Sequence, residues 1–348
     1  MAKDIIITPA SGIIDFLDNS TSKATITLDS NNTLQFSNGT VPTTFATSTA
    51  GCSALRVEGT NGVLFDITDD LSSSLMSVNT VAGLPVLEVF ADYSICAGRY
   101  GQSDLVLSSG GCLTVSGITV GKGAGGIASN TTVGYNALCS NTTGAQNTAV
   151  GYYTLCNSCG NYNTASGAYS MNLNSTGACN SAFGRTALYV NTTGNRNSAF
   201  GMNALCLNTT GGNNTAMWFG SLLCNTTGSC NTASGYRSMF YNTTGIANTA
   251  VGRASLEKNT IGLMNVAIGN RALFTNTTGS CNVAVGAAAL ESATTAVCNT
   301  AIGNYTLISN TTGQLNTALG ALAGYSVTTG GQNVAIGARS LCTEGAGA

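Results

Sequence analysis

The thirteen cysteines are the residues of this chain with the most evident chemistry, and several of them follow a regular spacing. Cys139 and Cys156 each follow a leucine, and Cys281 and Cys298 each precede an asparagine, with 17 residues between the members of each pair. Stacked thiols, disulfides and metal binding are all compatible with this spacing. Histidine is absent, so Cys2His2 zinc sites are excluded, and Cys156 with Cys159 forms a lone Cys-x-x-Cys.

The sequence contains no arrangement typical of an enzyme. Without histidine, Ser-His-Asp and Cys-His arrangements are impossible. After residue 125 the carboxylates are Glu257, Glu291 and Glu344, too far apart in sequence to suggest paired acid–base work. The aspartates at 69–70 are interpreted as a solvated turn, and "GKGAGG" at 121–126 lacks the Gly-Lys-Ser/Thr ending of a phosphate loop. We expect no enzyme, no cofactor and no metal site.

The composition favours an ordered chain rich in β-structure. Charged residues make up 7% of the 348 residues, the net charge is −2 and hydrophobic residues reach 43%, whereas disorder usually combines low hydrophobicity with high net charge. The basic residues are scattered, so we expect no nucleic-acid partner. No run of 18 apolar residues and no signal-peptide core is visible, so we expect folding in a cytoplasm and no membrane insertion.

A 17-residue repeat organises the C-terminal two thirds of the chain. The pattern Asn-Thr-Ala-Val-Gly recurs at intervals of 17 residues, with a single interval of 16. Its first asparagine stands at 130, 147, 163, 180, 197, 214, 231, 248, 265, 282, 299, 316 and 333. Alanine comes two residues later and leucine or methionine eight residues later in twelve of these thirteen copies.

This repeat predicts an all-β fold, a β-solenoid rod with one coil per unit. Seventeen residues are too few for a helical hairpin or a propeller blade, but they accommodate two short strands and two turns. Identical residues then lie above one another about 4.8 Å apart, so that asparagines form amide ladders and leucines fill the interior. Which face of the Asn-Thr-Ala-Val-Gly strand points inward is left open.

The tetrapeptide Asn-Thr-Thr-Gly keeps step with the repeat, and it matches the acceptor pattern for N-linked sugar at Asn141, Asn191 and five later positions. Related segments at Val327 and Ala293 keep the phase without an acceptor asparagine. We therefore interpret Asn-Thr-Thr-Gly as a corner of the coil, where Asn and Gly tolerate positive φ.

The chain is expected to have three parts. Residues 1–47 form an N-terminal β module for attachment or assembly, 48–125 a second β-rich module with a Gly-rich joint, and 126–348 the thirteen-copy shaft. Short β-prone runs such as "TLQFS" (33–37) and "GVLFDIT" (62–68) alternate with turn clusters in the first two parts.

Aromatic residues of the repeats are the candidate contact residues of the surface. Trp218 replaces the glycine of its copy, and the hypotheses are a tolerated bulge or, with Phe219, an exposed aromatic platform. Tyr152 and Tyr153 are a second candidate pair. Because a thin rod with few charges and apolar outer positions is a poor monomer, we expect a homo-oligomer about an axis along the rod.

The repeat resembles the shafts of phage tail fibres and related bacterial surface proteins, on the residues "NTTVGYNALCSNTTG" (130–144) and "NTAVGYYTL" (147–155). It is also similar to the head repeats of trimeric autotransporter adhesins, through "NVAIGNRAL" (265–273) and "NVAIGARSL" (333–341). Residues 64–92 look like a segment of structural proteins of tailed phages. Many such fibres end in a self-cleaving chaperone domain, whereas this sequence stops soon after the last repeat. We therefore expect that the chaperone has been removed, that another factor sets trimerisation, or that this end docks onto the next N-terminal module.

These resemblances imply a structural fibre of a tailed-phage virion, with a homotrimeric shaft for host attachment. The partners would be further copies of the chain, other virion proteins through the N-terminal region, and a host-surface glycan or protein. The alternative is a self-assembling extracellular filament or adhesin of a bacterium.

Overall fold

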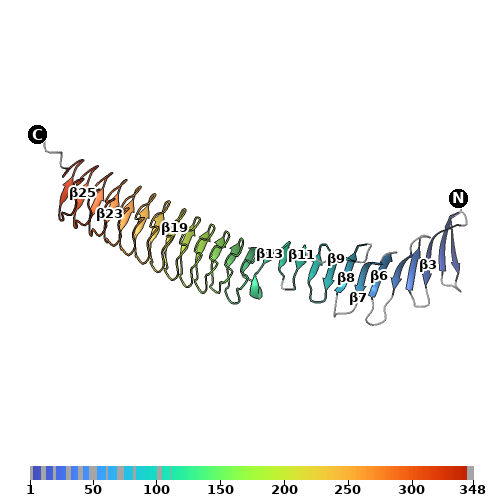
Figure 1. Ribbon diagram of the computed structural model, residues 1–348. Coiled ribbons are helices and arrows are strands. Elements are labelled where there is room, and N and C mark those ends of the chain that lie inside the picture. Colours follow the sequence, from blue (N-terminus) through green and yellow to red (C-terminus); the bar gives the residue numbers. More distant parts are fainter. Residues whose placement is uncertain are drawn as a thin grey trace. The chain divides into compact units, whose positions relative to one another are not determined.

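The computed structural model describes the strands between Lys3 and Thr68 without the segments that connect them, and then residues 74–80, 84–99, 104–109 and 111–342. The chain forms two compact units, Met1–Ile118 and Thr119–Ala348. Each can be found in Figure 1 by its colours, for which the bar gives the residue numbers. The aspartates at 69–70 lie outside the described residues. The three-part division of the chain remains a prediction.

The first unit consists of short strands that pair antiparallel with their neighbours in sequence. One sheet has the order β1-β2-β3-β4-β5. Strands β6 to β12 continue the same pattern, and the expected strands at 33–37 and 62–68 coincide with β4 and β7. The strands are β1 (Lys3–Thr8), β2 (Ile13–Asp18), β3 (Thr21–Leu28), β4 (Thr33–Ser37), β5 (Pro42–Ala46), β6 (Ser53–Gly59), β7 (Gly62–Thr68), β8 (Ser74–Asn79), β9 (Pro85–Phe90), β10 (Ile95–Ala97), β11 (Leu105–Leu107) and β12 (Leu113–Val115).

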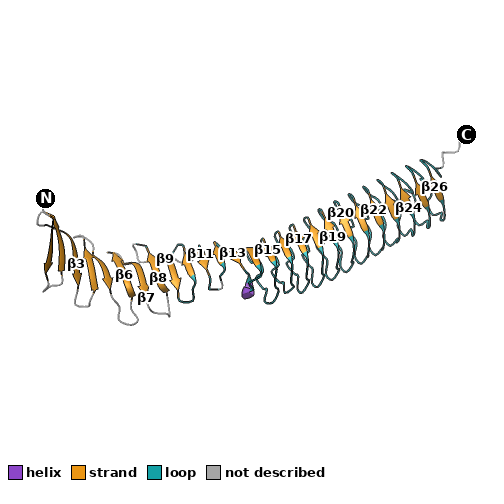
Figure 2. Ribbon diagram, turned by 180° about the vertical axis from the view of Figure 1, so that it is seen from behind, coloured by secondary structure: helices purple, strands orange, loops and turns teal. Residues whose placement is uncertain are grey.

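The second unit is the predicted β-solenoid. It opens with Thr119–Gly121 of β13 (Ile118–Gly121), which pair antiparallel with the first coil, and with a short 3-10 turn, η1 (Ala124–Gly126). Each coil then contributes one strand that pairs parallel with the next, so the strands stack in one column (Figure 2). They are β14 (Thr131–Gly134), β15 (Thr148–Val150), β16 (Thr164–Ser166), β17 (Ser181–Phe183), β18 (Ser198–Phe200), β19 (Thr215–Met217), β20 (Thr232–Ser234), β21 (Thr249–Val251), β22 (Val266–Ile268), β23 (Val283–Val285), β24 (Thr300–Ile302), β25 (Thr317–Leu319) and β26 (Val334–Ile336).

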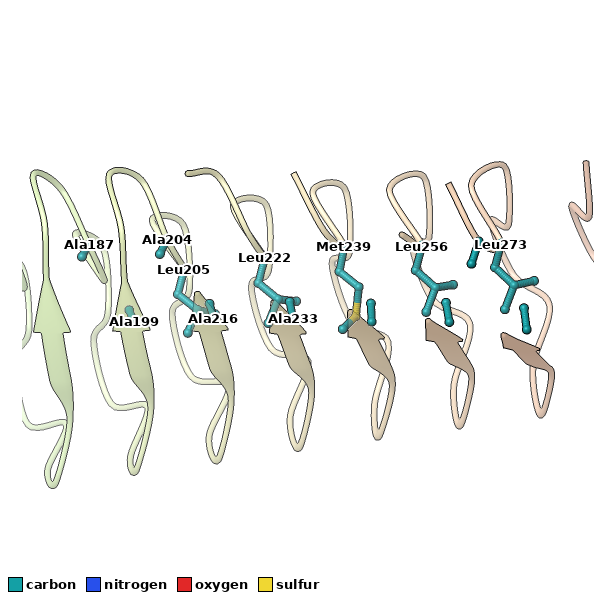
Figure 3. Packing of buried hydrophobic residues seen from close by; sticks show 14 of the residues in the cluster. Ala187, Ala199, Ala204, Leu205, Ala216, Leu222, Ala233, Met239, Leu256 and Leu273 are labelled. Atoms are coloured by element: carbon teal, nitrogen blue, oxygen red, sulfur yellow. The ribbon is translucent and has the colours of Figure 1, made fainter. Parts of the chain in front are cut away.

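The interior of the coil is filled by two apolar columns, which settles the inward face of the strand. The central residue of each strand points inward and is buried, and it is an alanine such as Ala199 or Ala216 in every strand except β14, which has Thr132. Leucine or methionine from the opposite side of the coil meets it, as Leu205, Leu222 and Met239 do in Figure 3. Burying one such side chain is worth about 1.5–3 kcal/mol, so every added coil adds to the stability of its neighbours.

Each coil has one strand rather than the two that the repeat length suggested. The leucine side of the coil is built from turns, in which most coils have three non-glycine residues with a left-handed backbone. In the coil that starts at Asn197 they are Asn203, Leu205 and Asn213, with φ of 61°, 50° and 57°. Their N–H groups donate to carbonyls of adjacent coils at 3.0–3.1 Å, which offsets the cost of the left-handed conformation.

Two buried asparagine ladders run along the solenoid. In the strand ladder, formed by the asparagine that starts each coil, the N–H of Asn214 donates to Oδ1 of Asn197 at 3.0 Å. In the corner ladder, formed by the asparagine of Asn-Thr-Thr-Gly, Nδ2 of Asn225 donates to Oδ1 of Asn208 at 2.7 Å. Both amides of a coil also donate to the carbonyl of the same corner glycine, such as Gly228. The predicted amide ladder is confirmed and is double.

The corner interpretation of Asn-Thr-Thr-Gly is right, but its physical reason was wrong. Neither Asn208 nor Gly211 has a positive φ. The asparagine is there for its ladder bonds, and the glycine because a Cβ at Gly211 would collide with the carbonyl of Gly228 and the amides of Asn208 and Asn225. The corner asparagines are fully buried, so the folded coil leaves no room for a sugar on them.

Candidate interaction surfaces

A stripe of apolar side chains follows the outer face of the parallel sheet. The residue after the buried alanine points outward in each strand, and in ten strands it is a large apolar residue that is 37–67% exposed. These residues, called the outer stripe below, are Val133, Val150, Phe183, Phe200, Met217, Val251, Ile268, Ile302, Leu319 and Ile336. Ser166 and Ser234 interrupt the stripe, and the rings of Phe183 and Phe200 stack with their centroids 5.0 Å apart. A row of exposed apolar side chains of this kind is a candidate interaction surface.

Trp218 lies on the outer surface beside this stripe. Its side chain is 67% exposed, and together with Phe200, Gly201, Met217 and Phe219 it lines an open hollow of about 320 Å³. The ring of Phe219 stacks on that of Tyr236 in the next coil, at 5.5 Å. The hollow therefore has an aromatic wall and adjoins the outer stripe at Phe200 and Met217.

The backbone of Trp218 is strained. Its φ is 90°, in the column where the other coils place a glycine with φ between 108° and 144°. A bulky residue in this region is a genuine outlier, with a cost of about 1–3 kcal/mol. Gly220, two residues later, has φ of 64° and occupies the position where other coils have a left-handed residue such as Arg237, so it does not relieve the strain at Trp218. Such strain at an exposed aromatic residue is typical of functional positions.

Tyr152 and Tyr153 belong to a second aromatic patch, in the first coils of the solenoid. The Tyr152 ring stacks on that of Tyr135 at 5.5 Å and meets the edge of Tyr153 at 4.6 Å, while Tyr153 stacks on Tyr169. Partial desolvation by this packing, and the neighbouring phenols, raise the pKa of Tyr152 above its usual value. The tyrosine patch presents hydroxyl groups on an apolar base, which suits a ligand with both kinds of surface.

The structure brings together the members of each predicted pair but not the two pairs. Tyr152 and Tyr153 are in direct ring contact, and Trp218 and Phe219 line one hollow. Four coils separate the two pairs, which is about 19 Å at the strand spacing. They are therefore two candidate surfaces rather than one site.

The spacing of the cysteines left stacked thiols, disulfides and metal binding open, and the structure contains both a disulfide and free thiols. Cys139 and Cys156 form a disulfide, with their Cα atoms 4.9 Å apart. Cys281 and Cys298 are free and exposed, as is Cys159 of the Cys-x-x-Cys. Burial raises the pKa of the Cys206 thiol above its usual value.

Two ion pairs with aromatic support were not foreseen from the sequence. Arg271 pairs with Glu291 of the next coil and lies over the Phe274 ring at 4.1 Å. The same arrangement joins Arg237, Glu257 and Phe240 two coils earlier. The 34-residue offset between the two arrangements was the signal that could have revealed them. In these pairs the only carboxylates of the described coils, Glu257 and Glu291, are bound to arginines.

The fold defines a class, the β-solenoid repeat proteins. No family model matches the chain, and no curated protein or solved structure is significantly similar to it. Among the described residues, no helix has the length and apolar character to cross a membrane. The same residues hold no cluster of three or more His, Cys, Asp or Glu side chains.

Proposed function

We propose that this chain is a structural fibre protein of a tailed-phage virion, whose solenoid forms a homotrimeric shaft for attachment to the host surface. The observation that carries the proposal is the outer stripe on a regular solenoid. A fibre shaft needs a rigid repeating core, which the ladders and the leucine column supply, and a surface by which chains associate.

The period of the outer stripe supports a further copy of the chain as its partner. One apolar side chain projects from each coil, about 4.8 Å from the next. A partner that covers the stripe along its whole length must present groups with the same rise, and a second solenoid of this sequence has that rise. The few charges of the chain leave ion pairs little part in the association.

The association is tested by charging the stripe. The variant F200K/I268K places two lysines in it, and T210K/T278K adds the same charge to exposed threonines elsewhere on the same coils. We expect the unmodified chain and the threonine variant to sediment as a trimer in analytical ultracentrifugation, and the stripe variant as a monomer. An unmodified chain that sediments as a monomer contradicts the proposal, as does a stripe variant that stays trimeric.

The two aromatic patches are the proposed contacts with the host. Trp218→Gly and the pair Y152A/Y153A remove one patch each without touching the outer stripe. We expect the trimer to bind host-cell surface or a glycan array, and at least one of these variants to lose that binding while remaining trimeric. Immunogold microscopy then separates the assignments, since label on virion tails supports a phage fibre and label on free cell-associated filaments the bacterial alternative.

A further inference from the structure

Three sulfur-bearing residues stand above one another on an exposed corner of the solenoid. Met264, Cys281 and Cys298 each precede the asparagine that starts the next coil, so consecutive coils place them in one column. Both cysteines are free and exposed, and Met264 is 57% exposed. We call these three residues the sulfur column.

The backbone holds the three residues in the same way. Their φ values are 55°, 57° and 57°, and each N–H donates to a carbonyl of the preceding coil at 3.0–3.1 Å. Equal backbone conformations make the Cα–Cβ bonds parallel, so the three side chains leave the corner in the same direction. One coil step separates Cα atoms by 4.9 Å at Cys139 and Cys156, and the same step separates neighbours in the sulfur column.

This spacing suits a metal ion held between two thiolates. A metal–thiolate bond is about 2.3 Å long in zinc sites, so two sulfurs on opposite sides of one ion are separated by about 4.6 Å. That distance is close to one coil step, and parallel side chains reach it without movement of the backbone. Thiolate and thioether ligands select soft ions such as copper(I), whereas a structural zinc site requires four ligands.

We propose that the sulfur column binds one soft, thiophilic cation of the copper(I) class. Cys281 and Cys298 are its two thiolate ligands, and Met264, one coil beyond Cys281, extends the exposed sulfur-bearing surface beside them. Binding displaces the two thiol protons to solvent. The proposal does not depend on the function proposed above.

The chain provides a matched control at the same corner. Cys179 and Cys230 occupy the equivalent position of other coils, are also free and exposed, and have left-handed φ of 58° and 59°. Their neighbours in the column carry no sulfur: Tyr162 and Arg196 for Cys179, Asn213 and Ala247 for Cys230. The variant C179S/C230S thus removes as many exposed thiols as C281S/C298S, without touching a pair.

The test is an anaerobic titration of the reduced, full-length chain with copper(I) against a chromogenic chelator. We expect C281S/C298S to lose one tightly bound equivalent relative to the unmodified chain, and C179S/C230S to lose none. Any copper held by the reduced Cys139–Cys156 pair is common to all three proteins and cancels. Equal stoichiometry in C281S/C298S and the unmodified chain, or an equal loss in C179S/C230S, overturns the proposal.

Two further measurements keep the result interpretable. Circular-dichroism melting of each variant is expected to match that of the unmodified chain, because serine replaces an exposed side chain. Met264→Leu is expected to leave the stoichiometry unchanged, because Met264 is not one of the two ligands. Loss of the tightly bound equivalent in Met264→Leu contradicts the assignment of the two thiolates.

Discussion

At the scale of single residues, the coil uses asparagine, glycine and leucine for reasons that differ from their usual ones. The corner glycine is needed for space and the corner asparagine for two side-chain hydrogen bonds, while leucine adopts a left-handed backbone in coil after coil. Stacking supplies the compensation, because each unusual conformation directs an N–H towards an adjacent coil. The free-energy cost of the left-handed backbone is therefore offset by hydrogen bonds between coils and not by contacts within one coil.

Gly211→Ala tests whether space sets the corner glycine. The added methyl group would collide with the carbonyl of Gly228 and two ladder amides, although the φ of Gly211 suits any residue. We expect the free energy of unfolding to fall by about 1–3 kcal/mol, the usual cost of overpacking. Gly212→Ala is the control, because its Cβ approaches only the backbone of Asn195, at 3.0 Å for the carbonyl oxygen. Equal losses in urea denaturation of the two variants would contradict the spatial explanation.

Trp218→Gly tests the strain in the aromatic hollow. Glycine adopts the φ of 90° without a steric cost, and the exposed indole contributes little burial that could be lost. We expect the free energy of unfolding to rise by about 1 kcal/mol or more. Trp218→Ala retains a Cβ at the strained position and removes the same ring, so it should show no such gain. A similar rise in both variants, measured by denaturant midpoint, would place the effect in the ring rather than the backbone.

The sequence predicted the residues whose types are uniform and missed those whose types vary. Every coil repeats its asparagine and most repeat the buried alanine and leucine, so the ladders and the core could be derived from the repeat. One left-handed position of the coil carries residues as different as Asn203, Arg237 and Ala254, and another carries the buried leucine, a residue type that does not indicate a left-handed backbone. Because the residue types do not reveal these left-handed turns, a second strand was expected on the leucine side of the coil, where the structure has none.

At the scale of the element, the corner ladder shows what an interruption costs. The coil that starts at Asn282 has Ala293 and Ala296 in place of the corner asparagine and glycine. The ladder stops there, and Oδ1 of Asn276 and Nδ2 of Asn310, which face Ala293 from either side, are buried without a partner. A buried unpaired polar group costs about 1–3 kcal/mol, so this coil is a weak point within the described solenoid.

The double variant A293N/A296G should repair this weak point. The introduced asparagine amide would donate to Oδ1 of Asn276 and accept from Nδ2 of Asn310, and the introduced glycine would leave room for that amide. We expect the free energy of unfolding to rise by about 1–2 kcal/mol. Ala293→Asn alone should gain less, because the methyl group of Ala296 occupies the space that glycine leaves at other corners. A single variant as stable as the double one in thermal and urea unfolding would show that the corner glycine is dispensable.

The candidate surfaces could be predicted only in part. Their aromatic residues are visible in the sequence, because they depart from the consensus of the repeat. The position of each ring along the coil and its orientation decide which aromatic residues share a patch. The same two properties place Trp218 and Tyr152 in separate patches. The sulfur column required the side chain of Met264 to be placed above Cys281, and the repeat phase alone does not show which corner positions are exposed.

At the scale of the whole molecule, stability is a sum over coils and interfaces, since each coil buries its leucine and alanine against its neighbours. The coil at Asn147 shows how far a coil can depart from the consensus. It has 16 residues, and Ser158 takes the buried place of the corner asparagine and accepts a bond from Nδ2 of Asn174 at 3.1 Å. One missing residue is absorbed at the corner, while the strand and the leucine keep their register. Length can therefore change in whole coils, and only slightly within one.

Deletion of whole coils follows from this rule. Removing residues 180–230 takes out three coils and joins Cys179 to Asn231, so both ladders and the leucine column meet in register. We expect the solenoid to fold and to be shorter by about 14 Å, three strand spacings, with an unchanged cross-section in small-angle X-ray scattering. Removing residues 180–222 instead leaves the repeat half a coil out of phase, which places polar turn residues where leucine and alanine are buried. That variant should be sensitive to protease at the junction and lose cooperative unfolding. If both deletions fold equally well, the coil register does not determine the architecture, and the stacking explanation of the repeat fails.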